Sequence, residues 1–400
     1  MRKQFLGICS AAVTIGLFVG LIAAPVKAHA FMDYSFGDGS EANPFRIRTC
    51  EEFASTMGPG VSVVGNFLIV NNLDCTAVDF TTGPTLLTGS IDGAGHTITN
   101  LTLGTYGLFY VIQNGTVKDL KLEGVMGDTF SSPMGSLAKQ IVNVDLINVH
   151  STVSMPDVGD GSGGLVGNAQ DSTITNSSYI GTMTSNFGGG LVGEAMNVTI
   201  TDSFTDGTIE GVNTGGMIGA NADSVTLTNV VSVMEATGAN AGGIVGPASI
   251  DASVDYGIYV GNGPLATGSN IISSSSLNAI VAHSYISGDN PQLIGDDYVN
   301  PTVSNSTMEN GPYSDVNVLT SWGGVIDKPL WRQDAVNTPP VLSAAMDFEL
   351  PSGAPNNGDS NGDSVDDGYQ YNVMPILIGG NESWVTVEIP DDLGCSLFDV

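Results

Sequence analysis

The chain has 400 residues, with 10 Lys plus Arg against 41 Asp plus Glu, so its formal net charge is -31. Nucleic acids and anionic membrane surfaces are bound mainly through Lys and Arg, and this balance therefore excludes both as principal partners. A hydrophobic content of 42% excludes a chain that is disordered for lack of apolar residues.

Residues 1–30 have the layout of a secretory signal peptide. Arg2–Lys3 give a basic start, Phe5–Pro25 form an apolar run, and Ala28–Ala30 form a small-x-small cleavage site. The run approaches the length that spans a membrane, so a retained anchor is the alternative. Because the Ala-x-Ala ending favours removal, we expect an exported protein with no integral membrane span after cleavage.

Residues 31–60 are expected to cover the N-terminal end of the fold that follows. Thr49–Glu52 matches the capping-box pattern, and one or two helical turns can follow it before Gly58–Gly60 ends them. An uncovered first coil would present unpaired backbone groups. A short capping helix is the prediction.

Cleavage of the signal peptide would leave Cys50, Cys75 and Cys395 in an oxidising compartment, where cysteines pair if geometry permits. Cys50 with Cys75 is the predicted disulfide, because both lie in the N-terminal region and Cys395 is remote. This bond would tie the capping helix to the first coils and leave Cys395 as an odd thiol.

The middle of the chain repeats. Apolar residues that follow glycines recur 26 to 29 positions apart, at Leu108, Leu137, Leu165, Leu191, Met217 and Ile244. So regular a period indicates an array of similar coils. A β-sandwich is the alternative, since it also has many short strands, but it does not require a fixed period.

Each repeat also contains a polar residue eleven positions after its apolar residue, or twelve in the fifth repeat, which a single inserted residue explains. These residues are Asp119, Asn148, Asn176, Asp202 and Asn229. Alternation such as Val198–Thr201 is typical of a strand, and the glycine pairs suit left-handed or otherwise strained turns. Stacked coils would give apolar columns inside and an Asn/Asp column at a turn, where side chains can bond from coil to coil.

These patterns predict an all-β fold, a right-handed parallel β-helix (solenoid) over residues 61–336 with its clearest repeats at 107–250. The short N-terminal capping helix precedes it, and residues 337–400 are expected to form a small C-terminal β domain. The prolines of Asn337–Pro340 mark the boundary, because proline cannot continue a ladder of backbone hydrogen bonds.

Two segments, 163–177 and 189–203, resemble GLUG repeats of bacterial surface and secreted proteins: each has Gly-Gly-Leu-Val-Gly, followed by Ser-Thr-Ile-Thr-Asn-Ser or Val-Thr-Ile-Thr-Asp-Ser. Upstream, residues 37–47 and 91–98 are similar to segments that commonly precede those repeats. The resemblance implies a parallel β-helix on or outside a bacterial cell, adhesive or scaffold-like, and it does not imply catalysis.

Residues 359–367 have the spacing of a calcium loop. Asp359, Asn361 and Asp363 would supply side-chain oxygens, Val365 a backbone carbonyl and Asp367 a carboxylate. The pattern departs from the EF-hand, because Ser364 replaces its glycine and Gln370 its last glutamate. It is more similar to short Asp-rich calcium loops between domains of secreted proteins. A solvated acidic linker is the alternative.

The segments 359–373, 384–388 and 394–397 are similar to the start of the choice-of-anchor U domain, which precedes C-terminal surface anchors in bacterial proteins. In that family the domain continues, whereas this chain stops at Val400. A C-terminal truncation would explain the absent anchor and the odd Cys395.

Catalysis is not expected, although the β-helix architecture also hosts polysaccharide lyases and hydrolases. Residues 140–327 contain no Lys or Arg that could act as the base of a lyase. The candidate pairs are Asp202 with Asp206 and Asp92 with His96, but Asp202 belongs to the turn column and Asp92 to a glycine-flanked turn. His150 and His283 are isolated and are interpreted as packing or surface residues.

The sequence therefore predicts a non-enzymatic exported protein of the bacterial surface or exterior, acting in adhesion or as a scaffold, with extracellular glycans or surface proteins as partners. A polysaccharide-binding or polysaccharide-degrading β-helix is the alternative.

Overall fold

The computed structural model describes residues 37–57, 62–78, 80, 86–104, 106–127, 133–261, 270–288, 291–296, 299–310, 331–332, 341–342, 372–378 and 381–387. The chain divides into two compact units, Met1–Phe348 and Glu349–Val400. The expected signal peptide lies outside the described residues, among which no helix is both long and apolar enough to span a membrane.

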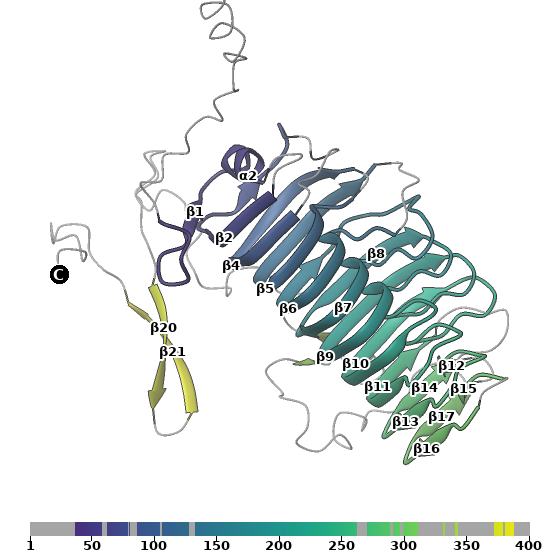
Figure 1. Cartoon of the computed structure of the whole chain (residues 1–400). Helices are drawn as coiled ribbons and strands as arrows, with labels where there is room; N and C mark the ends of the chain where they lie inside the picture. The colour runs from purple at the N-terminus through teal and green to yellow at the C-terminus, as the bar shows by residue number, and fades with distance from the viewer. Residues whose placement is uncertain are drawn as a thin grey trace, which may run out of the picture. The chain divides into compact units, whose positions relative to one another are not determined.

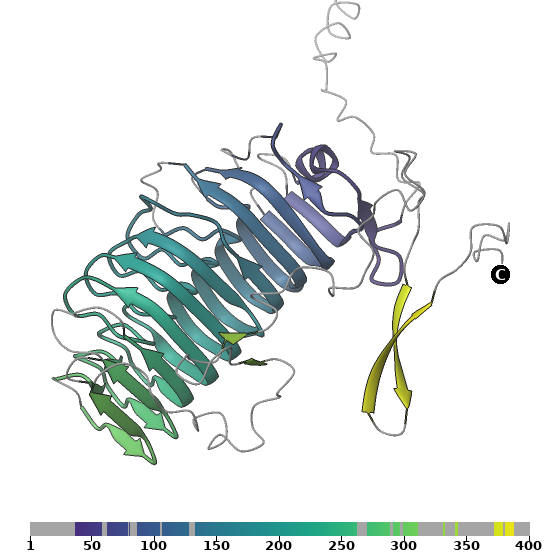
Figure 2. The same ribbon diagram turned by 180° about the vertical axis from the view of Figure 1, so that it is seen from behind.

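The first unit is a parallel β-helix, as predicted (Figure 1). Among the described residues, fifteen strands form one sheet in which successive coils pair in parallel, and Figure 2 shows the same stack from behind. The strands are β1 (Phe45–Ile47), β2 (Ser62–Ile69), β3 (Leu73–Asp74), β4 (Leu86–Leu103), β5 (Phe109–Met126), β6 (Ala138–Ser151), β7 (Val166–Thr175), β8 (Ser178–Thr184), β9 (Val192–Glu210), β10 (Asp223–Ala236), β11 (Ser253–Val260), β13 (Ile280–Ala282), β14 (Tyr285–Gly288), β16 (Thr302–Ser304) and β17 (Thr307–Asn310). A further parallel pair is β12 (Asn270–Ile272) with β15 (Gln292–Ile294).

The repeated apolar residues form buried columns inside the stack. All six residues of the repeat identified in the sequence are fully buried: Leu108, Leu137, Leu165, Leu191, Met217 and Ile244. Backbone bonds join neighbouring members, since the N–H of Leu165 donates to the carbonyl of Leu191 over 3.0 Å. A single coil cannot bury its apolar face, so the stacking of equivalent residues creates the core.

The inserted residue of the fifth repeat is confirmed by the strand register. Thr201 pairs with Thr228 and Ser203 with Val230, which places Asn229 beside Asp202. The extra residue therefore lies before strand β10 in the chain, and the Asn/Asp column stays in register.

Of the two kinds of turn expected at the glycine pairs, left-handed or otherwise strained, the left-handed kind is not found. None of the paired glycines at 163–164, 189–190, 215–216 and 242–243 has a positive φ. They are required for space, because a Cβ on Gly190 would collide with the carbonyl oxygen of Gly216, and one on Gly164 with the ring of Tyr179. The left-handed positions of the coils are occupied mostly by Asn and Asp, which tolerate that conformation.

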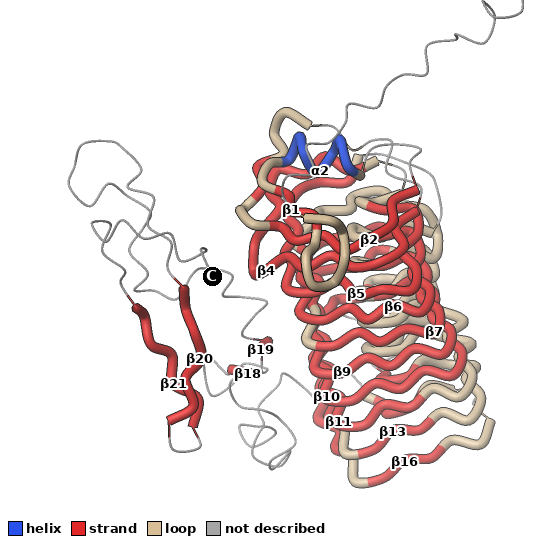
Figure 3. Tube along the Cα trace, turned by 60° about the vertical axis from the view of Figure 1, so that its left-hand side comes forward, coloured by secondary structure: helices blue, strands red, loops and turns tan. Residues whose placement is uncertain are grey.

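The N-terminal cap is confirmed. Helix α2 (Cys50–Thr56) lies at the N-terminal end of the stack (Figure 3), and the Thr49 hydroxyl accepts a bond from the Glu52 N–H. The Glu52 carboxylate accepts the Arg48 N–H over 2.8 Å, and hydrogen bonds from the Arg48 side chain and from the backbone N–H groups of Arg48 and Thr49 lower its pKa. Phe53 is fully buried and packs edge-on against Phe80 and Phe109, which seals the first coils.

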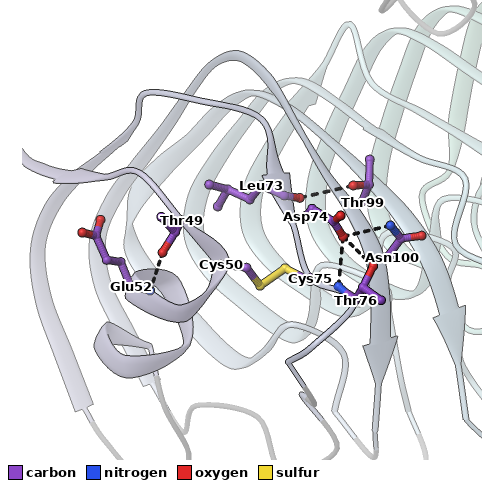
Figure 4. Close-up of a disulfide and its surroundings, with 9 residues drawn as sticks. All are labelled: Thr49, Cys50, Glu52, Leu73, Asp74, Cys75, Thr76, Thr99 and Asn100. Atoms are coloured by element: carbon purple, nitrogen blue, oxygen red, sulfur yellow. Dashed lines mark hydrogen bonds between the residues drawn. A yellow bond between two sulfur atoms is a disulfide. The ribbon is translucent and has the colours of Figure 1, made fainter. Parts of the chain in front are cut away.

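The predicted disulfide joins Cys50 of α2 to Cys75, which directly follows β3 (Figure 4). Both cysteines are buried, and their Cα atoms are 5.3 Å apart. Asp74 beside this bond accepts the Nδ2–H of Asn100 over 2.9 Å and the Thr76 hydroxyl over 2.6 Å. These bonds lower the pKa of Asp74 to about 2, so the carboxylate that fastens β3 to β4 is charged at neutral pH.

A short antiparallel hairpin covers part of the outside of the stack. It is formed by β18 (Trp331–Arg332) and β19 (Val341–Leu342). Trp331 and Leu342 are buried in a cluster with an outward column of β9, β10, β11 and β14, which consists of Phe204, Val231, Ile258 and Tyr285. In the second unit, β20 (Asn372–Ile378) and β21 (Asn381–Val387) form a separate antiparallel pair.

Candidate functional site

The predicted Asn/Asp column exists, and we call it ladder 1. Its members all have φ between 49° and 57° and lie at one corner of consecutive coils: Asp119, Asn148, Asn176, Asp202 and Asn229. Nδ2 of Asn148 donates to Oδ1 of Asp119 over 2.8 Å, and Nδ2 of Asn176 to Oδ1 of Asn148 over 3.1 Å. Asn229 donates in the same way to Asp202 over 3.1 Å. Amides thus connect coil to coil.

Ladder 1 continues as a pair of stacked rings. Tyr256 and His283 take the next two corner positions with φ of 53° and 45°, and their ring centroids lie 4.8 Å apart at 13°. Nδ1 of His283 is 2.9 Å from Oδ1 of Asp255, and Nε2 is 3.1 Å from Nδ2 of Asn305. The Asn305 amide donates, so Nε2 accepts and Nδ1 carries the proton toward Asp255.

A second column, ladder 2, was missed in the sequence. It occupies the preceding corner with left-handed φ values and consists of Asn114, Asn143, Asp171, Asn197, Ser224, Asp251, Asn278 and Asn300. Asn143 donates to Asn114 over 2.9 Å and Asn197 to Asp171 over 2.7 Å. Each member stands five residues before a residue of the ladder 1 corner, where the last three precede Tyr256, His283 and Asn305, and this constant spacing is the signal that could have revealed it.

The two ladders border a sheet strip on which each coil presents two outward side chains. In β7, β9 and β10 all six are threonines, and we call this set the threonine face: Thr173, Thr175, Thr199, Thr201, Thr226 and Thr228. Thr173, Thr199 and Thr226 are exposed, and the other three are half-buried. The hydroxyls of Thr175 and Thr201 are 3.0 Å apart.

An acidic groove lies on a different part of the stack. Its volume is 590 Å³, and it is lined by Asp157, Val158, Gly159, Asp160, Thr184, Ser185, Asn186, Glu210 and Gly211. Nδ2 of Asn186 donates to Oδ1 of Asp160 over 3.1 Å, and the Ser185 hydroxyl to the Gly159 carbonyl over 2.9 Å. The groove offers carboxylate and amide groups of the kind that bind hydroxylated ligands.

The carboxylate pairs considered in the sequence have separate partners. Asp202 belongs to ladder 1, while Asp206 lies on β9 in register with Val233 and Ile180. Burial raises the pKa of Asp206, since these surroundings disfavour its charge. Asp92 is 2.8 Å from Nζ of Lys118.

The histidines are held by polar neighbours of the stack. Nδ1 of His96 is 3.3 Å from Oδ1 of Asn72. His150 is buried, with Nδ1 at 2.8 Å from the Ser178 hydroxyl and Nε2 at 2.9 Å from Oδ1 of Asn148. Burial, and then the charge of Lys121, lower the pKa of His150 to about 3. His150 and His283 therefore occupy the packing and surface roles inferred from the sequence.

Basic and aromatic side chains meet on the first coils. Tyr106 and Tyr110 pack edge-on with centroids 4.9 Å apart. Nζ of Lys139 lies 5.5 Å and 5.4 Å from their ring centres, which are cation–π distances. The lysine stabilises this pair.

The predicted calcium ligands Asp359, Asn361, Asp363, Val365 and Asp367 lie outside the described residues. Within the described part of the chain, no group of three or more His, Cys, Asp or Glu side chains is placed to hold a metal ion. The calcium loop stays a prediction.

No protein-family model and no curated protein matches the chain. One solved structure that it resembles is that of a Bacteroides ovatus protein provisionally named an immunoglobulin A1 protease, with 16% identity and a TM-score of 0.44 over 77% of this chain and 94% of that one. Similarity at this level does not bear on activity.

Proposed function

We propose that the protein is a non-enzymatic, exported β-helix that serves as a scaffold at or outside a bacterial surface and offers its outward faces to partners. The observation that carries this proposal is the unbroken parallel stack with amide ladders at two corners. The amide bonds between coils, which are part-buried in ladder 1 and exposed in ladder 2, resist separation of the coils, and a hydrogen bond of this kind contributes about 0.5–1.5 kcal/mol. Such a stack makes a stiff support.

Two further features support export. The disulfide between Cys50 and Cys75 is typical of proteins that mature in oxidising compartments. The described Lys and Arg residues of the stack lie in its early coils, up to Lys139, and the later coils through Asn310 expose only acidic charges. A surface of this charge remains well solvated outside the cell.

A cell-binding assay and a glycan array with the purified protein separate the two forms of this proposal. Binding to neither supports a passive scaffold, whereas saturable binding to cells or glycans supports adhesion. Turnover of a polysaccharide on the same array would contradict the non-enzymatic proposal.

The acidic groove favours polysaccharide binding as a second candidate. Its carboxylates and the amide of Asn186 could bind sugar hydroxyls along neighbouring coils. If it is the binding site, Asp160→Asn and Glu210→Gln should abolish glycan binding while Asp296→Asn, an exposed carboxylate elsewhere, leaves it unchanged. Equal binding by all three variants would contradict this candidate.

A further inference from the structure

The threonine face is a two-dimensional lattice and not a collection of polar residues. Thr173, Thr199 and Thr226 are in strict register across three coils, and Thr175, Thr201 and Thr228 form the second column. Paired strands lie about 4.8 Å apart, and residues i and i+2 of a strand about 6.6 Å apart. The hydroxyl and methyl groups therefore repeat at fixed intervals in both directions.

The backbone holds this lattice in place. The residues between the threonines are Ile174, Ile200 and Leu227, which are fully buried in one apolar column. At the two edges, the ladders tie the coils together through Asn197 to Asp171 and Asn229 to Asp202. Threonine is β-branched, so its χ1 is restricted and its two groups keep nearly constant directions. The face is thus preorganised before anything binds to it.

The face is also uncharged. The charged residues nearest to its six threonines in the same columns are Asp145 on the preceding coil and Asp255 on the following one. The hydroxyl of Thr173 donates to Asp145 over 2.6 Å, so this carboxylate is partly satisfied by the face itself. The carboxylates of Asp171 and Asp202, which lie in the ladders at the two edges of the face, accept hydrogen bonds from the side-chain amides of Asn197 and Asn229.

A flat, uncharged lattice of this kind does not fit the usual ligands of an exposed sheet. Sugars are bound by aromatic rings and converging hydrogen-bonding groups, and protein interfaces are centred on large apolar or aromatic side chains. The six side chains of the face include no ring and no large apolar group; the exposed Ile147, which pairs with Thr175, borders the face on the preceding coil. The covered outer column that contains Phe204 and Val231 belongs to another face of the coils. The described residues leave Thr173, Thr199 and Thr226 exposed to water and the second column of three threonines half-buried.

We propose that the threonine face binds ice. Hexagonal ice presents crystal planes whose oxygen repeats are close to both spacings of the face, so the hydroxyl groups can replace lattice waters while the methyl groups fill the gaps between them. Each contact is weak, but all six act together without conformational cost, because the β-helix holds them in register. This proposal is independent of the scaffold and groove proposals.

The test is inhibition of ice recrystallisation by the purified protein, together with its incorporation into a slowly growing ice hemisphere. The variant Thr199→Tyr places a ring above the centre of the lattice, and tyrosine is favoured in strands, so the fold should tolerate it. The matched control is Thr182→Tyr, an exposed threonine of β8 outside the threonine face. Circular dichroism and the melting temperature check the fold of each variant.

The wild-type protein and Thr182→Tyr should inhibit recrystallisation and enter the ice, whereas Thr199→Tyr should lose both properties. A second variant, Thr226→Tyr, should show the same loss and covers the case in which Thr199→Tyr does not fold. A wild-type protein that is excluded from ice overturns the proposal. Equal inhibition of ice recrystallisation by folded Thr199→Tyr and Thr182→Tyr also overturns it. Binding of the wild-type protein to insoluble glycans without any binding to ice has the same consequence.

Discussion

The side-chain amide of Asn148 donates to the carboxylate of Asp119 over 2.8 Å, although the two residues are 29 positions apart in the chain. Oδ1 of Asn148 also accepts from Asn176 over 3.1 Å and lies 2.9 Å from Nε2 of His150. One residue thus joins three consecutive coils, and it does so from a left-handed backbone conformation with φ of 57°.

Replacing Asn148 by alanine should lower the free energy of unfolding by about 2–4 kcal/mol, because the ladder bonds are lost and alanine is strained at positive φ. Asn148→Gly removes the same bonds without the strain and should cost about 1 kcal/mol less. Urea unfolding measures both variants, with hydrogen exchange of β5 and β6 as a local readout, since coils can open separately. Equal stability of wild type and Asn148→Ala would show that the ladder contributes nothing.

His150 should make the protein less stable in mild acid. Its pKa is about 3 in the fold against about 6.5 in an unfolded chain, so between these values only the unfolded chain binds the proton. The stability that the uncharged His150 contributes to the fold is fully present above about pH 6.5. As the pH falls below this value, the free energy of unfolding decreases by at most about 1.4 kcal/mol per pH unit. Unfolding midpoints between about pH 5 and about pH 7.5 measure this slope.

The variant His150→Gln is the control for that measurement, because glutamine retains hydrogen-bonding groups and does not titrate. Its slope over the same range should be smaller than that of the wild type. If the two slopes coincide, another group governs the acid sensitivity.

Loss of the disulfide should weaken the N-terminal cap. Cys50 and Cys75 are 25 residues apart and both are buried. For a loop of this length, the paired variant Cys50→Ser/Cys75→Ser should be about 2–4 kcal/mol less stable. A reducing agent should destabilise the wild type similarly and leave the variant unchanged, as measured by thermal unfolding. Finding Cys50 open to alkylation in the oxidised, native protein would refute the bond.

The glycines that follow the repeated apolar pairs should not tolerate a methyl group. A Cβ on Gly193 would collide with the carbonyl oxygen of Gly161, which is backbone and cannot move aside. Gly193→Ala should cost about 3 kcal/mol or prevent folding. Gly95, at φ 80° with nothing near its missing Cβ, is the control. Gly95→Ala should cost only about 1–2 kcal/mol. Comparable melting temperatures for the two variants would contradict the packing argument.

The C-terminal loop should bind calcium. Isothermal titration calorimetry of the chelator-treated protein should show a calcium site that is lost in Asp363→Asn/Asp367→Asn, because both substitutions remove ligand charge. Asp391→Asn, a carboxylate outside the loop, is the control. Absence of calcium binding by the wild type would leave the loop as an acidic linker.

The fold and ladder 1 were accessible from the sequence because each depends on a local period. Leu165 and Leu191 occupy equivalent positions in successive coils, and both are buried in the core. Asn176 of ladder 1 follows Leu165 by eleven positions, the same spacing as in most other repeats. The disulfide and the capping helix followed from export chemistry and from the Thr49 pattern. The left-handed alternative for the glycine pairs is wrong, because their backbone has no positive φ and the need for glycine comes from close contacts between coils, which the sequence does not show.

The sequence by itself determined the period, the residues that face inward and the excess of negative charge. Only the tertiary structure decided what the outward residues form together. Thr173, Thr199 and Thr226 are separated by 26 and 27 positions in the chain, yet the register aligns them in one column. Ladder 2, the Tyr256–His283 stack and the acidic groove arise in the same way. The sequence repeat determines which residue types recur at equivalent positions. Which side chains become neighbours depends on how the coils are aligned, and backbone pairing between coils sets that alignment.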